Sequence, residues 1–295
     1  MEFELHVARR KGAKMRCGIT GIQGSGKTMS SLLMAKGLCG GDISKAAVIC
    51  SENGSADLYE HLGPYSVLPI TKNFAPEEYI KRINYLVSQG FEAIIIDSIS
   101  HEWEGAGGCL DIHRQMCADN KKNSFQAWSE ITPRHKSFID TILNAPVHII
   151  LCSRQKVEYS IDVADNGKKT ITKLGTKEIT REGLAYELTC AFELDKNHNA
   201  TVTKDRTEIF KDPLPFRITE AVGASMLEWC EMPSDLIAEF LRAKASLAKC
   251  NTHEELSELK ATLSPQLLNT LSFKREGNKR YADIKVWMER NAQKK

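Results

Sequence analysis

The chain has 295 residues, 42% of them hydrophobic, and a formal net charge of +2. This length and composition suit one large α/β domain with a small additional domain, and the near-neutral charge gives no argument for nucleic-acid binding by the chain as a whole. The nine Cys form no C-x-x-C pair and the eight His show no metal-ligand spacing, which argues against a disulfide framework and a zinc site. No apolar run approaches about 18 residues, so we expect a cytoplasmic protein without a membrane partner.

A phosphate-binding loop is the first feature in chain order. Residues 21–28 read GIQGSGKT, a full match to the pattern G-x-x-x-x-G-K-[ST]. A short apolar strand precedes the match and a helical apolar period follows it, which is the context that this motif needs. Lys27 is expected to reach the β- and γ-phosphates of ATP, and Thr28 to bind Mg²⁺. The predicted nucleotide-binding residues are Gly21, Gln23, Gly24, Ser25, Gly26, Lys27, Thr28 and Met29.

The following segments alternate between strands and helices. The apolar patterns predict strands at residues 46–50, 91–96 and 147–152, and an amphipathic helix over 76–89 that Gly90 ends. A further helix is expected near 110–117, then a polar loop over 118–124. Thr132 and Pro133 are typical of the start of another helix. This alternation predicts an α/β fold with a mostly parallel sheet covered by helices on both faces.

The pattern changes after residue 160. Residues 160–183 are polar and rich in Gly and Lys, a composition that predicts a weakly structured segment. Residues 188–194 and 201–204 are expected to form a hairpin around residues 197–199. From about Asp235 the chain is helical, and Thr252 begins a capping-box sequence. We therefore predict two domains, a core over residues 1–232 and a small helical domain over 233–295.

Polar residues at the ends of the predicted strands complete a candidate site. Asp97 ends the third strand, where ligands bind in open α/β sheets, and it is predicted to help to hold Mg²⁺. Glu52 follows the second strand, which the simplest layout places next to the strand of the phosphate loop. It is the candidate for orienting or deprotonating water. Residues 153–156, after the fourth strand, offer polar side chains for the γ-phosphate.

These segments resemble a known family. The order GITGIQGSGKT, AAVICSENGSADLY, FEAIIIDSIS and HIILCSRQ is similar to the RecA-type ATPase core. The segments IIIDSISHEWEG, WSEITPRHKSFID and ATVTKDRTEIF make the chain resemble the phage RecA/RadA-like AAA ATPases of the Sak single-strand-annealing group. The resemblance covers residues 13–230 approximately and implies a RecA-type P-loop NTPase core.

The resemblance also implies roles for single residues. Glu52 would activate water, and Asp97 with Ser98 would bind Mg²⁺. Gln155 matches the position that senses the γ-phosphate, although Arg154 or Lys156 could serve instead. Lys204 and Arg206 match a basic pair that reaches the nucleotide of a neighbouring subunit, which implies a homo-oligomeric ring or filament.

The resemblance implies a phage protein in a bacterial host that acts on single-stranded DNA in recombination or replication, by annealing or strand pairing. The matching DNA-binding segments are residues 105–124 and 159–181, which contain several Lys and Arg. Two other functions stay open: a nucleotide-gated loader for a helicase or a single-strand-binding protein, and a small-molecule P-loop kinase.

Overall fold

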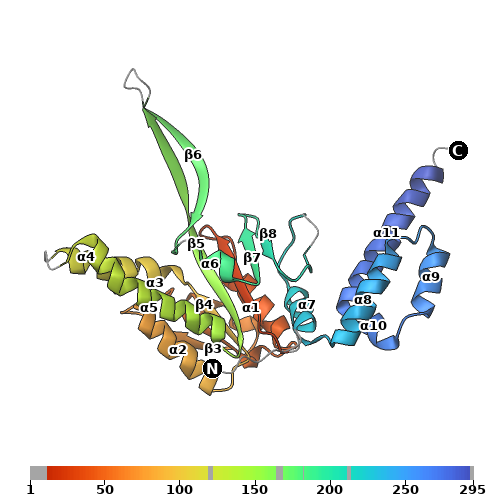
Figure 1. Cartoon of the computed structure of the whole chain (residues 1–295), viewed down its shortest axis with the longest axis horizontal. Coiled ribbons are helices and arrows are strands. Elements are labelled where there is room, and N and C mark those ends of the chain that lie inside the picture. Colours follow the sequence, from red (N-terminus) through yellow and green to blue (C-terminus); the bar gives the residue numbers. More distant parts are fainter. Residues whose placement is uncertain (1–11, 119–121, 164–168, 182, 211–213, 293–295) are drawn as a thin grey trace, which may run out of the picture. The chain divides into compact units, whose positions relative to one another are not determined.

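The computed structural model describes residues 12–118, 122–163, 169–181, 183–210 and 214–292. They form two compact units, one spanning Lys14–Ala224 and the other containing the chain from Ser225 onward. The first unit is built on a sheet and the second is helical (Figure 1). No helix in these ranges combines the length and apolarity that crossing a bilayer requires.

A mostly parallel sheet forms the centre of the first unit, as predicted. Its strands lie in the order β3-β2-β4-β5-β1-β7-β8, and only the β7–β8 pair on this path is antiparallel. The strands are β1 (Arg16–Gly21), β2 (Ala46–Cys50), β3 (Ser66–Pro69), β4 (Ala93–Asp97), β5 (His148–Val163), β7 (Cys190–Leu194) and β8 (Ala200–Asp205). The expectation that β2 adjoins β1 is wrong, because β4 and β5 lie between them.

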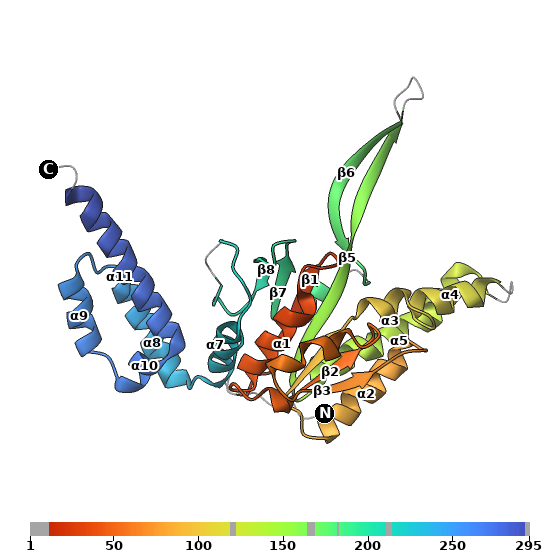
Figure 2. The same ribbon diagram turned by 180° about the vertical axis from the view of Figure 1, so that it is seen from behind.

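Helices cover both faces of the sheet (Figures 1 and 2). The helices α2 (Pro76–Ser88) and α5 (Ser124–Asn144) pack on one face, where Tyr79 and Phe138 share a buried cluster with Ile94 and Ile96 of β4. Ile95 is also fully buried and, because side chains alternate along a strand, it points to the opposite face. The helix α1 (Lys27–Leu38) packs against β4 and β5 on that side. Burial of both faces explains why these strands read as continuous apolar runs.

Shorter elements complete the chain. They are η1 (Ile43–Lys45), η2 (Ser55–Leu62), α3 (Ser100–Glu104), α4 (Cys109–Ala118), α6 (Leu184–Glu187) and α7 (Glu220–Glu231). The C-terminal helices are α8 (Ser234–Leu247), α9 (His253–Ala261), α10 (Pro265–Asn269) and α11 (Leu271–Ala292). They enclose a separate apolar core that includes Leu247, Leu256, Leu267 and Phe273. The helical C-terminal region is thus confirmed.

Two local predictions are wrong. The helix that was expected to start at Pro133 starts at Ser124, because Asn123 and Gln126 form a complete capping box and Pro133 lies inside the helix. The segment 160–183, which was expected to be weakly structured, instead contains the end of β5 at Val163 and the strand β6 (Lys169–Glu178). The two strands pair in antiparallel fashion. These two strands project beyond the sheet as a long arm (Figure 1).

Within the first unit, α1 closely crosses the first turn of α7, residues 220–224. A Cβ atom at Gly37 would lie 2.0 Å from the carbonyl oxygen of Glu220 and 2.5 Å from the amide nitrogen of Ala224. A Cβ at Gly223 would lie 2.1 Å from the carbonyl oxygen of Met34. The two backbones therefore approach so closely that only glycine fits at both positions.

We predict that Gly37→Ala destabilises the protein, because the new methyl group overlaps backbone atoms that cannot rotate away. Overpacking of this kind costs about 1–3 kcal/mol, measurable as a lower midpoint of urea unfolding. Gly277→Ala is the matched control: Gly277 also lies inside a helix, but its Cβ would meet only Lys260 Cε at 3.9 Å. An unchanged midpoint in Gly37→Ala would show that the crossing is not tightly packed.

Candidate active site

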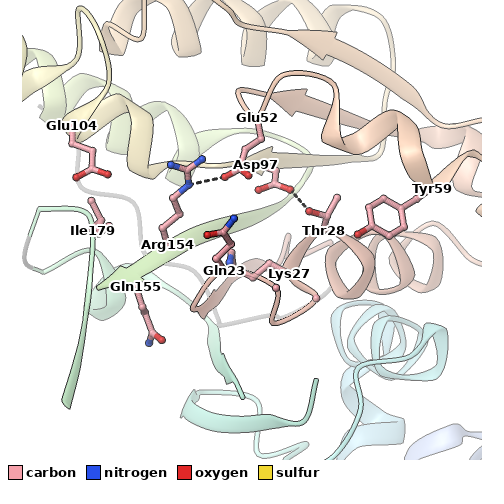
Figure 3. Close-up of a pocket in the computed structure, with 12 residues that line it drawn as sticks. Gln23, Lys27, Thr28, Glu52, Tyr59, Asp97, Glu104, Arg154, Gln155 and Ile179 are labelled. Atoms are coloured by element: carbon pink, nitrogen blue, oxygen red, sulfur yellow. Dashed lines mark hydrogen bonds and ion pairs between the residues drawn. The ribbon is translucent and has the colours of Figure 1, made fainter. Parts of the chain in front are cut away.

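A polar pocket lies where β1, β2, β4 and β5 end. These strands are mutually parallel, so their carboxyl ends meet at one edge of the sheet. The pocket encloses about 380 Å³ (Figure 3). Its lining residues are Gln23, Gly24, Gly26, Lys27, Thr28, Glu52, Tyr59, Asp97, Glu104, Arg154, Gln155 and Ile179.

The phosphate loop has the backbone that its glycines allow. Gly24 and Gly26 have φ angles of 77° and 84°, a conformation that other residues rarely adopt. Gly26 is further restricted by His198, in the turn between β7 and β8, because a Cβ at Gly26 would lie 2.8 Å from His198 Nδ1. The predicted strand–loop–helix context is present, since the loop connects β1 to α1.

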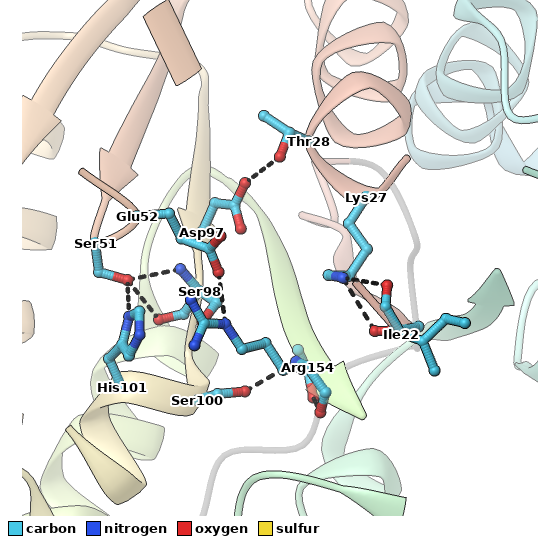
Figure 4. A network of polar contacts seen from close by, with 12 residues as sticks. Ile22, Lys27, Thr28, Ser51, Glu52, Asp97, Ser98, Ser100, His101 and Arg154 are labelled. Carbon is cyan, nitrogen blue, oxygen red and sulfur yellow. Dashed lines mark hydrogen bonds and ion pairs between the residues drawn. The ribbon is translucent and has the colours of Figure 1, made fainter. Parts of the chain in front are cut away.

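Lys27 is the cation of this loop. Its Nζ donates to the carbonyl oxygens of Gly21 and Ile22, each at 3.0 Å (Figure 4). The side chain is largely buried and lines the pocket. Its ammonium group is therefore held beside the loop, where it can neutralise phosphate charge.

Thr28 and Asp97 form an oxygen pair at the end of β4. Thr28 Oγ1 donates to Asp97 Oδ2 at 2.6 Å. Asp97 is only 1% exposed, and this burial raises the pKa of its carboxyl group, against the lowering effect of the Thr28 hydrogen bond. A hydroxyl and a carboxylate are the hard oxygen ligands that Mg²⁺ prefers, so the donor set fits this ion.

Ser98 follows Asp97 in the chain. It is buried, and its backbone N–H donates to Ser51 Oγ at 2.8 Å. Ser51 Oγ also lies 2.7 Å from His101 Nδ1, so the residues following β2 and β4 are joined by hydrogen bonds (Figure 4).

Glu52 and Arg154 form an ion pair across the pocket. Arg154 Nε lies 2.8 Å from Glu52 Oε1, and the backbone N–H of Arg154 donates to Ser100 Oγ at 2.9 Å. Glu52 enters from the loop after β2 and Arg154 from β5, so the carboxylate reaches the site although β2 is not adjacent to β1.

Gln155 also lines the pocket, but its amide is directed elsewhere. Gln155 Nε2 donates to Thr20 Oγ1 at 3.2 Å and to Glu193 Oε1 at 3.1 Å, which turns it away from Glu52 (Figure 3). Lys156 is absent from the described lining. Of the three candidates for the γ-phosphate, Arg154 is the one whose charged group pairs with Glu52.

The remaining predicted site residues lie around the pocket or away from it. Gly21, Ser25 and Met29 belong to the loop and the first turn of α1, but they are not among the described lining residues. Lys204 and Arg206 lie at the edge strand β8, where Lys204 Nζ donates to the carbonyl oxygens of Ala185 and Tyr186, and Arg206 donates to that of Tyr186. Neither lines this pocket. Partial burial and the neighbouring Arg206 lower the pKa of Lys204.

Sequence reasoning missed one aromatic lining residue, Tyr59, which projects from η2 beside Thr28 (Figure 3). Glu104, which the sequence offers as an alternative to Glu52 for activating water, ends α3 and also lines the pocket. The signal for Tyr59 is an aromatic residue seven positions after Glu52, in the segment that follows a strand of the site. An aromatic ring at the rim of a polar pocket is suited to stacking on a nucleotide base.

Comparison with known proteins agrees with this geometry. A family described as AAA domain matches residues 13–212. The chain belongs to the AAA domain family. No curated protein matches the chain. As a member of the P-loop NTPase superfamily, this AAA protein binds nucleotide, and nucleoside triphosphatase activity is the activity expected of its family.

We predict that Lys27→Ala weakens ATP binding by this AAA protein roughly 10–150-fold, since a hydrogen bond to a charged group contributes about 1.5–3 kcal/mol. Titration of a fluorescent ATP analogue measures this change. Lys36→Ala is the matched control, because Lys36 lies on the same helix and pairs with Glu220 outside the pocket. Wild-type affinity in a folded Lys27→Ala protein would contradict the assigned phosphate site.

Proposed function

We propose that this AAA protein is a Mg²⁺-dependent ATPase that acts on single-stranded DNA in phage recombination or replication. The observation that carries the proposal is the convergence of Lys27, Thr28, Glu52 and Asp97 at one edge of the sheet. A binding site for ATP needs only Lys27 and Thr28. The carboxylate of Glu52 adds a group able to take a proton from water.

Each residue has a role in hydrolysis. Lys27 binds the β- and γ-phosphates, and Thr28 with Asp97 would hold Mg²⁺, which would supply positive charge to neutralise the phosphates. Glu52 is the general base that orients and deprotonates water. The guanidinium of Arg154 is paired with the carboxylate of Glu52 in the present structure. This guanidinium is suited to turn to the γ-phosphate when ATP enters the pocket. That movement would free the Glu52 carboxylate for water.

Glu52→Gln is predicted to bind ATP with nearly unchanged affinity but to hydrolyse it about 10²–10⁴ times more slowly, because the amide cannot accept the proton from water. Phosphate release under saturating Mg²⁺ and ATP measures the rate. Glu60→Gln provides the control, since Glu60 is exposed on η2 and is not one of the lining residues.

The ATPase rates of Glu52→Gln and Glu104→Gln together show which of these two carboxylates of the pocket is the general base. If Glu52→Gln turns over normally and Glu104→Gln does not, Glu104 is the base and the proposed role of Glu52 is wrong.

The course of β5 supports an action on DNA. Gly21 of β1 is paired with Arg154, and from Gln155 onward the same strand pairs with β6 as the projecting arm. One continuous strand thus links the γ-phosphate side of the pocket to the segment expected to contact single-stranded DNA. A change in the position of Arg154 can therefore be transmitted to the arm along a short stretch of one strand.

We also propose a homo-oligomer, ring or filament, in which Lys204 and Arg206 act on the nucleotide of a neighbouring subunit. Both lie at the edge strand and are held by carbonyl oxygens of α6 rather than by the pocket of their own chain. A head-to-tail interface would present them to a second phosphate site. There they would stabilise charge on the transferred phosphoryl group, as an arginine finger does.

Mixing experiments test this assembly. Arg206→Ala and Lys27→Ala are each expected to be nearly inactive, yet a mixture should recover part of the ATPase activity, because some interfaces then pair an intact phosphate loop with an intact Arg206. The effect of a finger is roughly 10³–10⁵ in rate. Absence of recovery in subunits that demonstrably co-assemble would argue against action in trans. Full ATPase activity of the double variant Lys204→Ala/Arg206→Ala would show that these two residues have no role in hydrolysis.

A further inference from the structure

A second cluster of reactive side chains lies outside the nucleotide pocket. Glu102 of α3, Cys109 at the start of α4 and His135 of α5 come together, with all their ligand atoms within 4.8 Å of one another. His135 Nδ1 lies 3.0 Å and 3.1 Å from the two carboxylate oxygens of Glu102, and Cys109 Sγ lies 3.1 Å from Glu102 Oε1. None of the three is used in the proposed hydrolysis of ATP.

The cluster is enclosed. Glu102 and Cys109 are fully buried, and His135 is 6% exposed. The ring of His135 packs edge-on against Trp103 and Phe138, which makes one wall of the cluster aromatic. A carboxylate in such surroundings is costly unless it is paired or bound to a cation.

We propose that Glu102, Cys109 and His135 form a zinc site that joins α3, α4 and α5. A thiolate, an imidazole nitrogen and a carboxylate oxygen are the three ligand types that Zn²⁺ takes in proteins, with distances of about 2.0–2.3 Å from the ion. Tetrahedral ligands at such distances lie roughly 3.3–3.7 Å apart, so the separations of Glu102 from His135 and from Cys109 would need to widen by about half an ångström. Zn²⁺ replaces the thiol proton, which leaves with solvent. The ion, thiolate, carboxylate and neutral imidazole then sum to zero charge.

The position of the site would let the ion join two parts of the fold, with the fourth tetrahedral position left to water. Glu102 lies two residues before Glu104, which lines the nucleotide pocket, and residues 105–108 connect it to Cys109. Zinc would therefore fix the segment after β4 to α5. The sequence conceals the cluster because each ligand comes from a different helix, so that no two of them have the short spacing of common zinc motifs.

Metal content tests the proposal directly. The full chain, purified without chelator from cells grown with added zinc, is desalted in excess Mg²⁺, which occupies the oxygen site of Thr28 and Asp97, and its zinc is measured by mass spectrometry. We expect about one zinc per chain in the wild type and under roughly a tenth of that in Cys109→Ser and His135→Gln, since each removes one of three ligands.

Cys117→Ser is the matched control, because Cys117 lies on the same helix but outside the cluster, and it should keep the wild-type zinc content. Replacement of zinc by Co²⁺ in the wild type should give a thiolate-to-cobalt charge-transfer band and a tetrahedral visible spectrum. This measurement needs no variant to fold. A wild type that holds no more zinc than folded Cys109→Ser, or a cobalt spectrum without the thiolate band, would overturn the proposal.

Discussion

The parallel direction of β1, β2, β4 and β5 is the constraint on which the site depends. Because these strands run the same way, their carboxyl ends meet at one edge, and residues that follow them are brought together although they lie far apart in sequence. Parallel pairing is possible here because apolar side chains are buried on both faces of the sheet. The apolar strand sequences and the polar residues that follow them are thus two parts of one arrangement.

The two charged contacts of the pocket differ in how firmly they are held. Asp97 is nearly inaccessible and its hydrogen bond to Thr28 is short, so this pair is fixed by its surroundings. The side chains of Arg154 and Glu52 are 40% and 26% exposed, and an ion pair so open to water contributes little to stability. It can therefore be exchanged for a contact with phosphate at small cost. We infer that the Thr28–Asp97 pair is rigid and that the Arg154–Glu52 pair is the part of the site that can rearrange.

Local patterns allowed much of this to be predicted from the sequence. The phosphate loop, β2, β4 and the hairpin of β7 and β8 follow from short motifs and apolar periods, and Asp97 and Glu52 follow from their places after strands. Strand order did not follow, because it is set by packing between distant segments, and the simplest layout placed β2 beside β1. The true order puts β4 and β5 between them, yet Glu52 still reaches the pocket from the loop after β2.

The remaining errors also have physical causes. Pro133 resembled a helix start, but the capping box at Asn123 begins the helix nine residues earlier than Thr132 would. The β5–β6 arm was missed because the polar, Gly- and Lys-rich composition of residues 160–183 outweighed a short strand pattern, the alternation of apolar and polar residues over 157–163. The cluster of Glu102, Cys109 and His135 depends on contacts between three helices and has no local signal at all.

Hydrolysis of ATP is best tested through the rate of phosphate release by the wild-type protein, measured with Mg²⁺ and ATP in the presence and absence of single-stranded DNA. We predict hydrolysis that depends on Mg²⁺ and rises when DNA is added, because β5 carries Arg154 of the pocket and continues into the β5–β6 arm. Tight ATP binding without turnover under either condition would contradict it and would favour a nucleotide-gated loader in place of an ATPase.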